Sequence, residues 1–160
     1  MKIVFTGGGT GGHFYPIIAV AEALRDEVKT RKLLEPQLYF FGPDVLDRRA
    51  LYENSITFVK TPAGKMRRYS SLLNFFDIFK TLWGIMTTLM ELYRIFPDVV
   101  FSKGGYGSVP ALTAAKILGI PVIAHDSDAI PGRATLLAAR FAKKIAISYD
   151  EAFEYFPKDT

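Results

Sequence analysis

Short apolar runs alternate along the chain with longer stretches in which apolar residues recur every three or four positions. The short runs have the length of β-strands, and the longer stretches have the period of amphipathic helices. Strands are therefore predicted at residues 2–6, 37–41, 57–60, 98–102, 121–124 and 144–148. Helices are predicted at residues 16–29, 45–53, 71–95, 109–118 and 133–142, with a final helical turn at 151–155.

This alternation predicts a parallel sheet whose successive strands are joined by right-handed helical crossovers. The strands are mostly apolar, as expected when helices cover both faces of a sheet. We therefore expect an α/β domain with a doubly wound, Rossmann-like sheet over residues 1–160. Ligands of such sheets bind beyond the carboxyl ends of the strands. The segments predicted at that edge are residues 7–13, 42–44, 61–70, 103–108 and 125–132.

The composition is that of a folded domain. Of the 160 residues, 49% are hydrophobic and 22% are charged, which is typical of a globular protein and not of a disordered one. The absence of cysteine excludes a disulfide framework and a thiolate metal site. The net charge of +4 is too small to indicate nucleic acid by itself, and it suits an anionic membrane or a phosphorylated ligand. We expect no secretory leader and no membrane-spanning helix.

The first predicted strand ends in a glycine-rich turn, Gly7-Gly8-Gly9-Thr10-Gly11-Gly12-His13. A glycine turn between a strand and a helix presents backbone N–H groups and a helix N-terminus to an anion such as phosphate. Gly7, Gly9 and Gly12 also match the G-x-G-x-x-G fingerprint of dinucleotide-binding domains, which requires an acidic residue about 20 positions further on. The nearest candidate, Asp44, lies well beyond that distance. A turn without a ligand and an NAD-type binding module both stay open as alternatives.

A second glycine turn, Gly104-Gly105-Tyr106-Gly107-Ser108, follows the strand predicted at residues 98–102. The helix predicted at 109–118 comes directly after it, so the arrangement of strand, turn and helix is repeated. Two such turns in one domain indicate a phosphorylated ligand more strongly than either turn does alone.

The chain has two histidines, His13 and His125, and each is predicted just after a strand, at the ligand-binding edge. Either imidazole is able to act as a general base near neutral pH. At the start of a helix, the helix dipole disfavours the protonated form of His13. The carboxylates of Asp126 and Asp128 are able to orient His125, as in a catalytic triad. The alternative is a polar turn that caps the next helix, and the spacing of these groups does not require a metal.

The helix predicted at residues 71–95 has an unusually wide apolar face. Its polar residues form one narrow stripe, so the remaining apolar arc is wider than one face of a sheet requires. An apolar arc beside a basic cluster is typical of a protein resting on an anionic membrane. Deep burial and contact with another protein are the alternatives. The residues predicted to contact the membrane are Phe75, Phe76, Phe79, Trp83, Lys65, Arg67 and Arg68.

Three motifs, in this order, resemble the N-terminal half of the MurG-type enzymes of glycosyltransferase family 28. These bacterial enzymes add N-acetylglucosamine to the lipid-linked muramyl-pentapeptide of peptidoglycan synthesis. Together the motifs span nearly the whole chain. They are Gly8–His13 with Pro16; Gly104-Gly105-Tyr106 with Ser108 and Pro110; and Gly119-Ile120-Pro121-Val122 leading to His125 and Gly132.

The resemblance implies one half of a GT-B fold. In that family the N-terminal domain holds the lipid acceptor at the membrane, and the C-terminal domain supplies most contacts to the UDP-sugar donor. Residues 1–160 are then the acceptor-binding domain, inactive alone, and a donor-binding domain or a separate chain completes the enzyme. The implied localisation is cytoplasmic, peripheral on the inner face of the cell membrane.

The reaction implied is transfer from UDP-N-acetylglucosamine to an undecaprenyl-diphosphate-linked acceptor, which converts lipid I to lipid II. Transfer inverts the anomeric carbon and uses no metal or other cofactor. A non-catalytic, membrane-docking subunit of a two-chain glycosyltransferase is an alternative.

The resemblance also assigns roles to residues of the two turns. His13 is the first choice for the base that deprotonates the acceptor hydroxyl, with Asp126 and His125 as second candidates. The residues assigned to the donor are Thr10, Gly11, Gly12 and Asp128. The residues assigned to the acceptor diphosphate are Gly104, Gly105, Tyr106, Gly107 and Ser108. The usual His-Glu-Gln-Asn of the family reads His125-Asp126-Ser127-Asp128 here, so that Asp128 replaces an amide by a negative charge.

Overall fold

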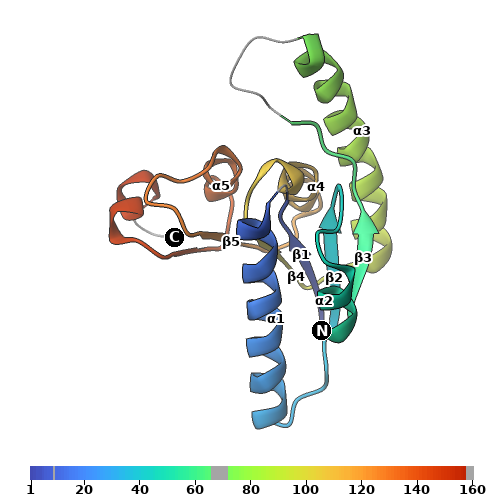
Figure 1. The fold of residues 1–160 in the computed structure, drawn as a ribbon, viewed down its shortest axis with the longest axis vertical. Coiled ribbons are helices and arrows are strands. Elements are labelled where there is room, and N and C mark those ends of the chain that lie inside the picture. The colour runs from blue at the N-terminus through green and yellow to red at the C-terminus, as the bar shows by residue number, and fades with distance from the viewer. Residues whose placement is uncertain (9, 66–71, 158–160) are drawn as a thin grey trace.

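Helices cover both faces of one twisted parallel sheet (Figure 1). The computed structural model describes residues 1–8, 10–65 and 72–157. The strand order is β3-β2-β1-β4-β5-β6, and every neighbouring pair is parallel. The strands are β1 (Lys2–Thr6), β2 (Gln37–Gly42), β3 (Ile56–Lys60), β4 (Val99–Ser102), β5 (Val122–Asp126) and β6 (Lys144–Ile147). The predicted doubly wound, Rossmann-like sheet is confirmed.

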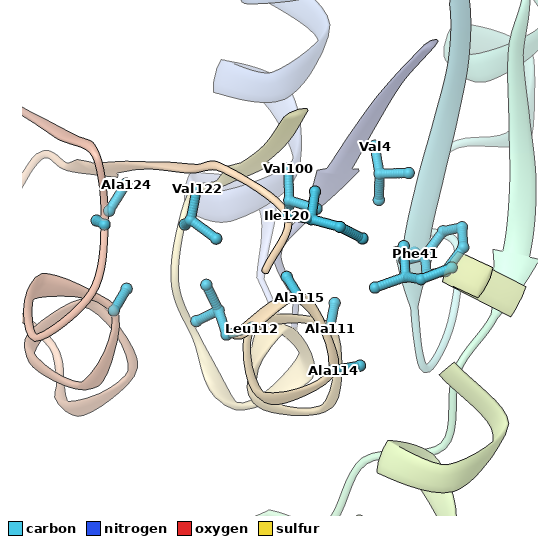
Figure 2. Packing of buried hydrophobic residues seen from close by; sticks show 13 residues of the cluster. Val4, Phe41, Val100, Ala111, Leu112, Ala114, Ala115, Ile120, Val122 and Ala124 are labelled. Atoms are coloured by element: carbon cyan, nitrogen blue, oxygen red, sulfur yellow. The ribbon is translucent and has the colours of Figure 1, made fainter. Parts of the chain in front are cut away.

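The helices divide between the two faces of the sheet. They are α1 (Gly11–Thr30), α2 (Arg48–Glu53), α3 (Leu72–Ile95), α4 (Val109–Leu118) and α5 (Arg133–Ala139), with 3₁₀ turns η1 (Tyr106–Ser108) and η2 (Asp150–Tyr155). On one face, Phe14 and Ile17 of α1 pack with Phe5 and Phe40 of the sheet. Helices α3, α4 and α5 contribute to the core on the other face, where alanines of α4 lie against the valines of the strands (Figure 2).

The strand order reverses between β1 and β4, which lie side by side at the centre of the sheet. From β1 the chain passes through α1 to β2, and from β4 it passes through α4 to β5, on the opposite side. The loops that leave the two strands therefore separate to opposite faces. In an open α/β sheet, this switch point is where a ligand crevice forms.

Helix α1 begins at Gly11 and not at the predicted residue 16, so that prediction was wrong. Thr10 is extended, with φ −149° and ψ 163°, and its carbonyl accepts the N–H groups of His13 and Phe14. These two bonds close the first helical turn over residues that the sequence analysis assigned to a loop because of their glycines. His13 therefore lies inside the first turn of a 20-residue helix.

Strand β5 continues to Asp126, two residues beyond its predicted end, so the prediction of a loop at His125 was wrong. The extension has a partner, because His125 pairs with Ala146 and Asp126 pairs with Ile147 of β6. Polar residues usually mark the end of a buried strand, but here the ladder with β6 keeps them extended. Side chains alternate across a strand, so His125 and Asp126 point to opposite faces of the sheet.

Helix α3 presents most of its apolar arc to solvent and turns the glycine and threonines of its polar stripe toward the protein. Within the stripe, Gly84 is buried and Thr88 is 0% exposed. Thr81 accepts the N–H of Gly64 at 3.1 Å and donates to the Asp77 carbonyl at 2.8 Å. The arc is exposed at Phe75, Phe76, Ile78, Phe79, Leu82, Trp83, Met86, Met90 and Tyr93. Burial of the arc within the described chain is therefore excluded.

The N-terminal half of α3 projects past the carboxyl edge of the sheet (Figure 1). The C-terminal half packs on α4 and supplies Leu92 to the core. Among the described residues, no helix is both long enough and apolar enough to cross a membrane.

Replacing Gly84 with alanine tests the crossing of α3 over the segment at Pro62. A Cβ at position 84 would lie 1.7 Å from the Pro62 carbonyl oxygen, so α3 has to move away. We expect Gly84→Ala to lower the free energy of unfolding by about 1–3 kcal/mol, the usual cost of overpacking. Urea denaturation measures this difference.

Gly12→Ala is the matched control, because Gly12 is also helical and a Cβ there would be in ordinary van der Waals contact, 3.8 Å from Thr10 Oγ1. Alanine favours a helix over glycine by up to about 1 kcal/mol, so this variant should be unchanged or slightly more stable. Equal stability of the two variants would contradict the close crossing.

Candidate active site at the two glycine turns

The two glycine turns contact each other beyond the ends of β1 and β4. A Cβ on Gly8 would lie 3.1 Å from the Cα of Gly107, and one on Gly105 would lie 2.5 Å from the Gly8 carbonyl oxygen. Gly104 and Gly105 also have positive φ values of 82° and 81°, which non-glycine residues rarely adopt. Glycine is therefore required here for close backbone approach. The fingerprint residue Gly9 lies outside the described residues.

The His13 imidazole lies at the junction of the two turns. Its Nδ1 atom is 2.8 Å from Thr10 Oγ1. Its Nε2 atom faces Gly105, since a Cβ on that glycine would be 3.2 Å away. Burial lowers the pKa of His13 below the ordinary value, and the nearby Lys103 ammonium lowers it further, although Asp128 and Asp126 partly oppose this. The ring is therefore neutral at physiological pH.

The first turn of α1 adds backbone groups to the same place. The N–H groups of Gly11 and Gly12 belong to the N-terminal donors for which a helix has no internal acceptor. Pro16 lies within α1 and has no N–H, so the Gly12 carbonyl lacks its usual helical donor. This turn therefore offers both donors and an acceptor. Gly12 lines the crevice, whereas Gly11 lies against Tyr15 and Leu46.

Asp126 holds the loop that closes the other side of the crevice. Its buried carboxylate accepts the N–H of Asp128 at 3.0 Å and that of Gly132 at 3.2 Å. These bonds fix the loop between β5 and α5, and they place Asp128 opposite His13 in the same cavity. Asp126 therefore holds the loop in place, a role that the sequence analysis did not predict when it named Asp126 as a candidate base.

Lys103 is a site residue that the sequence analysis missed. It follows β4, is 4% exposed, and donates from Nζ to Ser127 Oγ at 2.9 Å. Burial lowers the pKa of Lys103, and the carboxylates of Asp126 and Asp128 oppose that shift. A lysine between an apolar strand and a glycine pair was a recognisable feature, because a charge in that position needs a partner when it is buried.

Two adjoining cavities open at this edge, and both are lined by His13, Gly105, Asp128 and Gly132. The first has a volume of about 200 Å³, and its other lining residues are Thr10, Gly12, Lys103, Asp126, Ser127 and Thr135. The second, of about 330 Å³, extends toward α3, and its other lining residues are Gly64, Thr81, Tyr106, Val109, Arg133 and Ala134.

The structure keeps two predicted site side chains away from these cavities. The His125 ring stacks on Phe101 with a centroid distance of 6.2 Å, and its buried Nδ1 has no hydrogen-bond partner among the described residues. Burial and Lys103 lower the pKa of His125. Ser108 is buried, and its hydroxyl donates to the Gly105 carbonyl at 2.8 Å. Ser108 and the buried Gly107 therefore shape the second turn from within.

The described residues among the predicted membrane contacts lie at the same end of the molecule as the crevice. Phe75, Phe76, Phe79 and Trp83 are exposed on the projecting half of α3 (Figure 1). The Lys65 ammonium lies 5.7 Å from the centre of the Tyr106 ring. The predicted contacts Arg67 and Arg68 lie outside the described residues. In the part of the chain that the structure describes, no group of three or more acidic or histidine side chains could hold a metal ion.

A pH titration of the His13 ring by NMR tests this electrostatic arrangement. We expect His13 to titrate below the ordinary histidine value of 6.5. Lys103→Met removes the repulsion between the ammonium and the protonated ring, so the pKa of His13 should rise. Lys116→Met, in the last turn of α4, should leave it unchanged. An unchanged His13 pKa in Lys103→Met would show that the ammonium does not act on this ring.

Known proteins are similar to this chain over nearly its whole length. A protein of Treponema denticola is 44% identical over 158 residues, which are 97% of this chain and 40% of that protein. It is named UDP-N-acetylglucosamine--N-acetylmuramyl-(pentapeptide) pyrophosphoryl-undecaprenol N-acetylglucosamine transferase. The protein of the same name from Treponema pallidum is 43% identical over 98% of this chain and 39% of its own length. This chain therefore spans about two fifths of the length of these relatives.

The crystal structure of Acinetobacter baumannii MurG has the same fold, with a TM-score of 0.73, 25% identity, and coverage of 95% of this chain and 43% of that one. The resemblance to the MurG-type enzymes is confirmed. The model of the glycosyltransferase family 28 N-terminal domain matches residues 3–147, and the chain therefore belongs to that family.

Proposed function

We propose that this chain is the acceptor-binding domain of an enzyme that transfers N-acetylglucosamine from UDP-N-acetylglucosamine to a lipid-linked muramyl-pentapeptide. The relatives are named for this transfer, and the chain matches about 40% of their length. A donor-binding domain, in the same polypeptide or in a second chain, completes the enzyme. The observation that carries the proposal is the position of His13 Nε2, beside Gly105 and on the wall shared by both cavities.

In the proposed reaction, the acceptor hydroxyl attacks the anomeric carbon of the donor sugar. The new C–O bond forms as the bond to UDP breaks, and the bonding electrons leave with the UDP phosphate. His13 Nε2 takes the hydroxyl proton. This role requires the tautomer in which Nδ1–H donates to Thr10 Oγ1, and the 2.8 Å separation supports that bond. The lowered pKa of His13 keeps Nε2 free to accept the proton.

The second glycine turn is proposed to bind the acceptor diphosphate. The positive φ of Gly104 and Gly105 turns the backbone so that the chain enters η1 directly after β4. Gly105 and Tyr106 line the larger cavity, which Arg133 also lines. Backbone donors and a guanidinium suit a diphosphate. The buried Gly107 and Ser108 support this turn through their packing and the bond to the Gly105 carbonyl.

The donor is proposed to approach the first turn. Thr10 and Gly12 line the smaller cavity together with Asp128. Gly11 supports the start of α1. In this position the Asp128 carboxylate is able to accept hydrogen bonds from sugar hydroxyls. UDP-N-acetylglucosamine enters as a substrate, and the chain itself supplies the base and the backbone donors.

The exposed face of α3 is proposed to rest on the inner surface of the cytoplasmic membrane. Contiguous exposed apolar patches of this kind mark interaction surfaces. The aromatic rings of the patch pack on one another, with centroids 5.0 Å apart for Phe75 and Phe79. The larger cavity reaches Thr81 on the same helix. A lipid whose diphosphate occupies that cavity therefore has a short route to the membrane.

The family assignment favours sugar transfer over the NAD-type alternative. A non-catalytic docking subunit stays an alternative, and the activity of His13 variants separates the two.

The catalytic proposal is tested by supplying a donor-binding domain, for instance the C-terminal part of the Treponema denticola relative, fused or co-expressed with this chain. We expect transfer to a lipid-diphosphate acceptor only in the combined protein. His13→Ala should lower its turnover by roughly 10²–10⁴-fold, the usual contribution of a general base.

His125→Phe serves as the comparison, because phenylalanine preserves the stacking on Phe101 and only a base role for His125 would make it inactive. A correctly folded combined protein without activity would refute the proposal. Near-normal turnover of His13→Ala would remove His13 as the base.

Liposome flotation tests the membrane face. Changing Phe75, Phe76, Phe79 and Trp83 to serine should abolish flotation with vesicles that contain anionic lipid, because the apolar area that enters the headgroup region is lost. The control carries Leu34→Ser and Tyr52→Ser, which are 92% and 86% exposed elsewhere on the surface, and it should float like the wild type. Equal flotation of both variants would contradict the proposed face.

A further inference from the structure

A third cavity, of about 250 Å³, lies on the other side of the first glycine turn. It is bounded by the first turn of α1 and by the loop that follows β2. It shares Thr10 with the smaller crevice cavity and Tyr106 with the larger one, so it adjoins the crevice at these two residues. The lining residues are Gly8, Thr10, Phe14, Phe40, Pro43, Asp44, Val45, Leu46, Lys65 and Tyr106.

This third cavity combines an apolar floor with one group of each charge. Phe14 and Phe40 are almost completely buried and contact each other edge to face, with centroids 5.5 Å apart. Leu46 is 58% exposed at the rim. The exposed Asp44 carboxylate accepts the Val45 N–H at 2.8 Å, which leaves its other oxygen available to a ligand donor.

The ammonium that lines the cavity belongs to Lys65, which is exposed and lies over the Tyr106 ring. A carboxylate, an ammonium and an apolar floor together complement a peptide, which has amide donors, a terminal carboxylate and aliphatic side chains. They complement a phosphate poorly, because Asp44 would repel it.

The acceptor named in the relatives has four parts, namely a muramyl sugar, a pentapeptide, a diphosphate and a lipid. The proposed function places the reacting sugar hydroxyl at His13, the diphosphate at Gly105 and the lipid toward α3. The peptide branches from the same sugar and needs a separate exit. The third cavity adjoins the proposed sugar position, because Thr10 and Tyr106 also line the crevice cavities.

We propose that this cavity is the subsite for the peptide of the acceptor, with Asp44 receiving its amide donors, Lys65 its carboxylate and Leu46 its aliphatic side chains. The inference rests on the proposed function. It assigns a binding role to the loop after β2, which contains no residue of the two glycine turns.

Two acceptors that differ only in the peptide test this subsite. Both have a short, water-soluble prenyl chain, a diphosphate and N-acetylmuramic acid, and one also has the pentapeptide. In NMR titrations of the 160-residue chain, we expect both to shift His13 and Gly105. The pentapeptide acceptor alone should shift Asp44 and Leu46, and it should bind about tenfold more tightly.

Variants of the loop after β2 show whether its side chains contact the peptide. Asp44→Asn and Leu46→Ala should each reduce the affinity for the pentapeptide acceptor several-fold and leave that for the peptide-free acceptor unchanged. Leu34→Ala, an exposed leucine outside all three cavities, should change neither affinity. Equal losses for both acceptors would overturn the subsite.

The remaining outcomes separate the subsite from the proposed function. The subsite alone would be overturned if the two acceptors bound with equal affinity and shifted His13 and Gly105 but neither Asp44 nor Leu46. No shift at His13 and Gly105 with either acceptor would refute the proposed function and the subsite with it.

NAD is a further probe, because an acidic residue at the end of the second strand binds ribose in dinucleotide-binding sheets. Stronger shifts of Asp44 with NAD than with the pentapeptide acceptor would also overturn the subsite.

Discussion

The contact between the two glycine turns determines the rest of this site. A Cβ on Gly105 or Gly107 would lie 2.5 Å from the Gly8 carbonyl oxygen or 2.8 Å from Pro43 Cδ, and one on Gly8 would press on the Cα of Gly107 at 3.1 Å. The contact occurs where the strand order reverses, so it joins the N-terminal turn of α1 to the loop that follows β4. It brings the His13 ring to Gly105 and creates a wall common to both crevice cavities. Glycine at these positions therefore lets the His13 ring and the second glycine turn lie next to each other.

The charges around His13 and the exposed face of α3 complete this end of the molecule. The buried Lys103 ammonium lies near both histidines, and its positive charge disfavours a second one on either ring, while Asp126 fixes the loop that carries Asp128. Helix α3 places polar and small residues against the protein, because Gly84 allows a close crossing at Pro62, and this leaves its aromatic residues outside. The crevice cavities and the exposed apolar half of α3 therefore lie at the carboxyl edge of the sheet.

The periodicity of the sequence was sufficient for the sheet, because buried parallel strands and amphipathic helices have distinct patterns. It failed where tertiary contacts override local preference. Glycines at 11 and 12 indicate a loop, but the Thr10 carbonyl starts a helix there, and the ladder with β6 keeps His125 in a strand. The position of Lys103 between an apolar strand and a glycine pair was visible in the sequence, but its partner Ser127, 24 residues away, was not. The wide apolar arc of α3 was visible in the sequence, whereas its direction depended on the packing at Gly84.

The central claim is that the junction of the two glycine turns holds the acceptor with its hydroxyl at His13. A crystal structure of this chain bound to a short-chain prenyl diphosphate acceptor tests it most directly. The account predicts diphosphate oxygens within hydrogen-bond distance of the backbone N–H groups of Gly105 and Tyr106, and an acceptor hydroxyl within reach of His13 Nε2. A diphosphate bound elsewhere on the chain, with His13 facing no hydroxyl of the sugar, would contradict it.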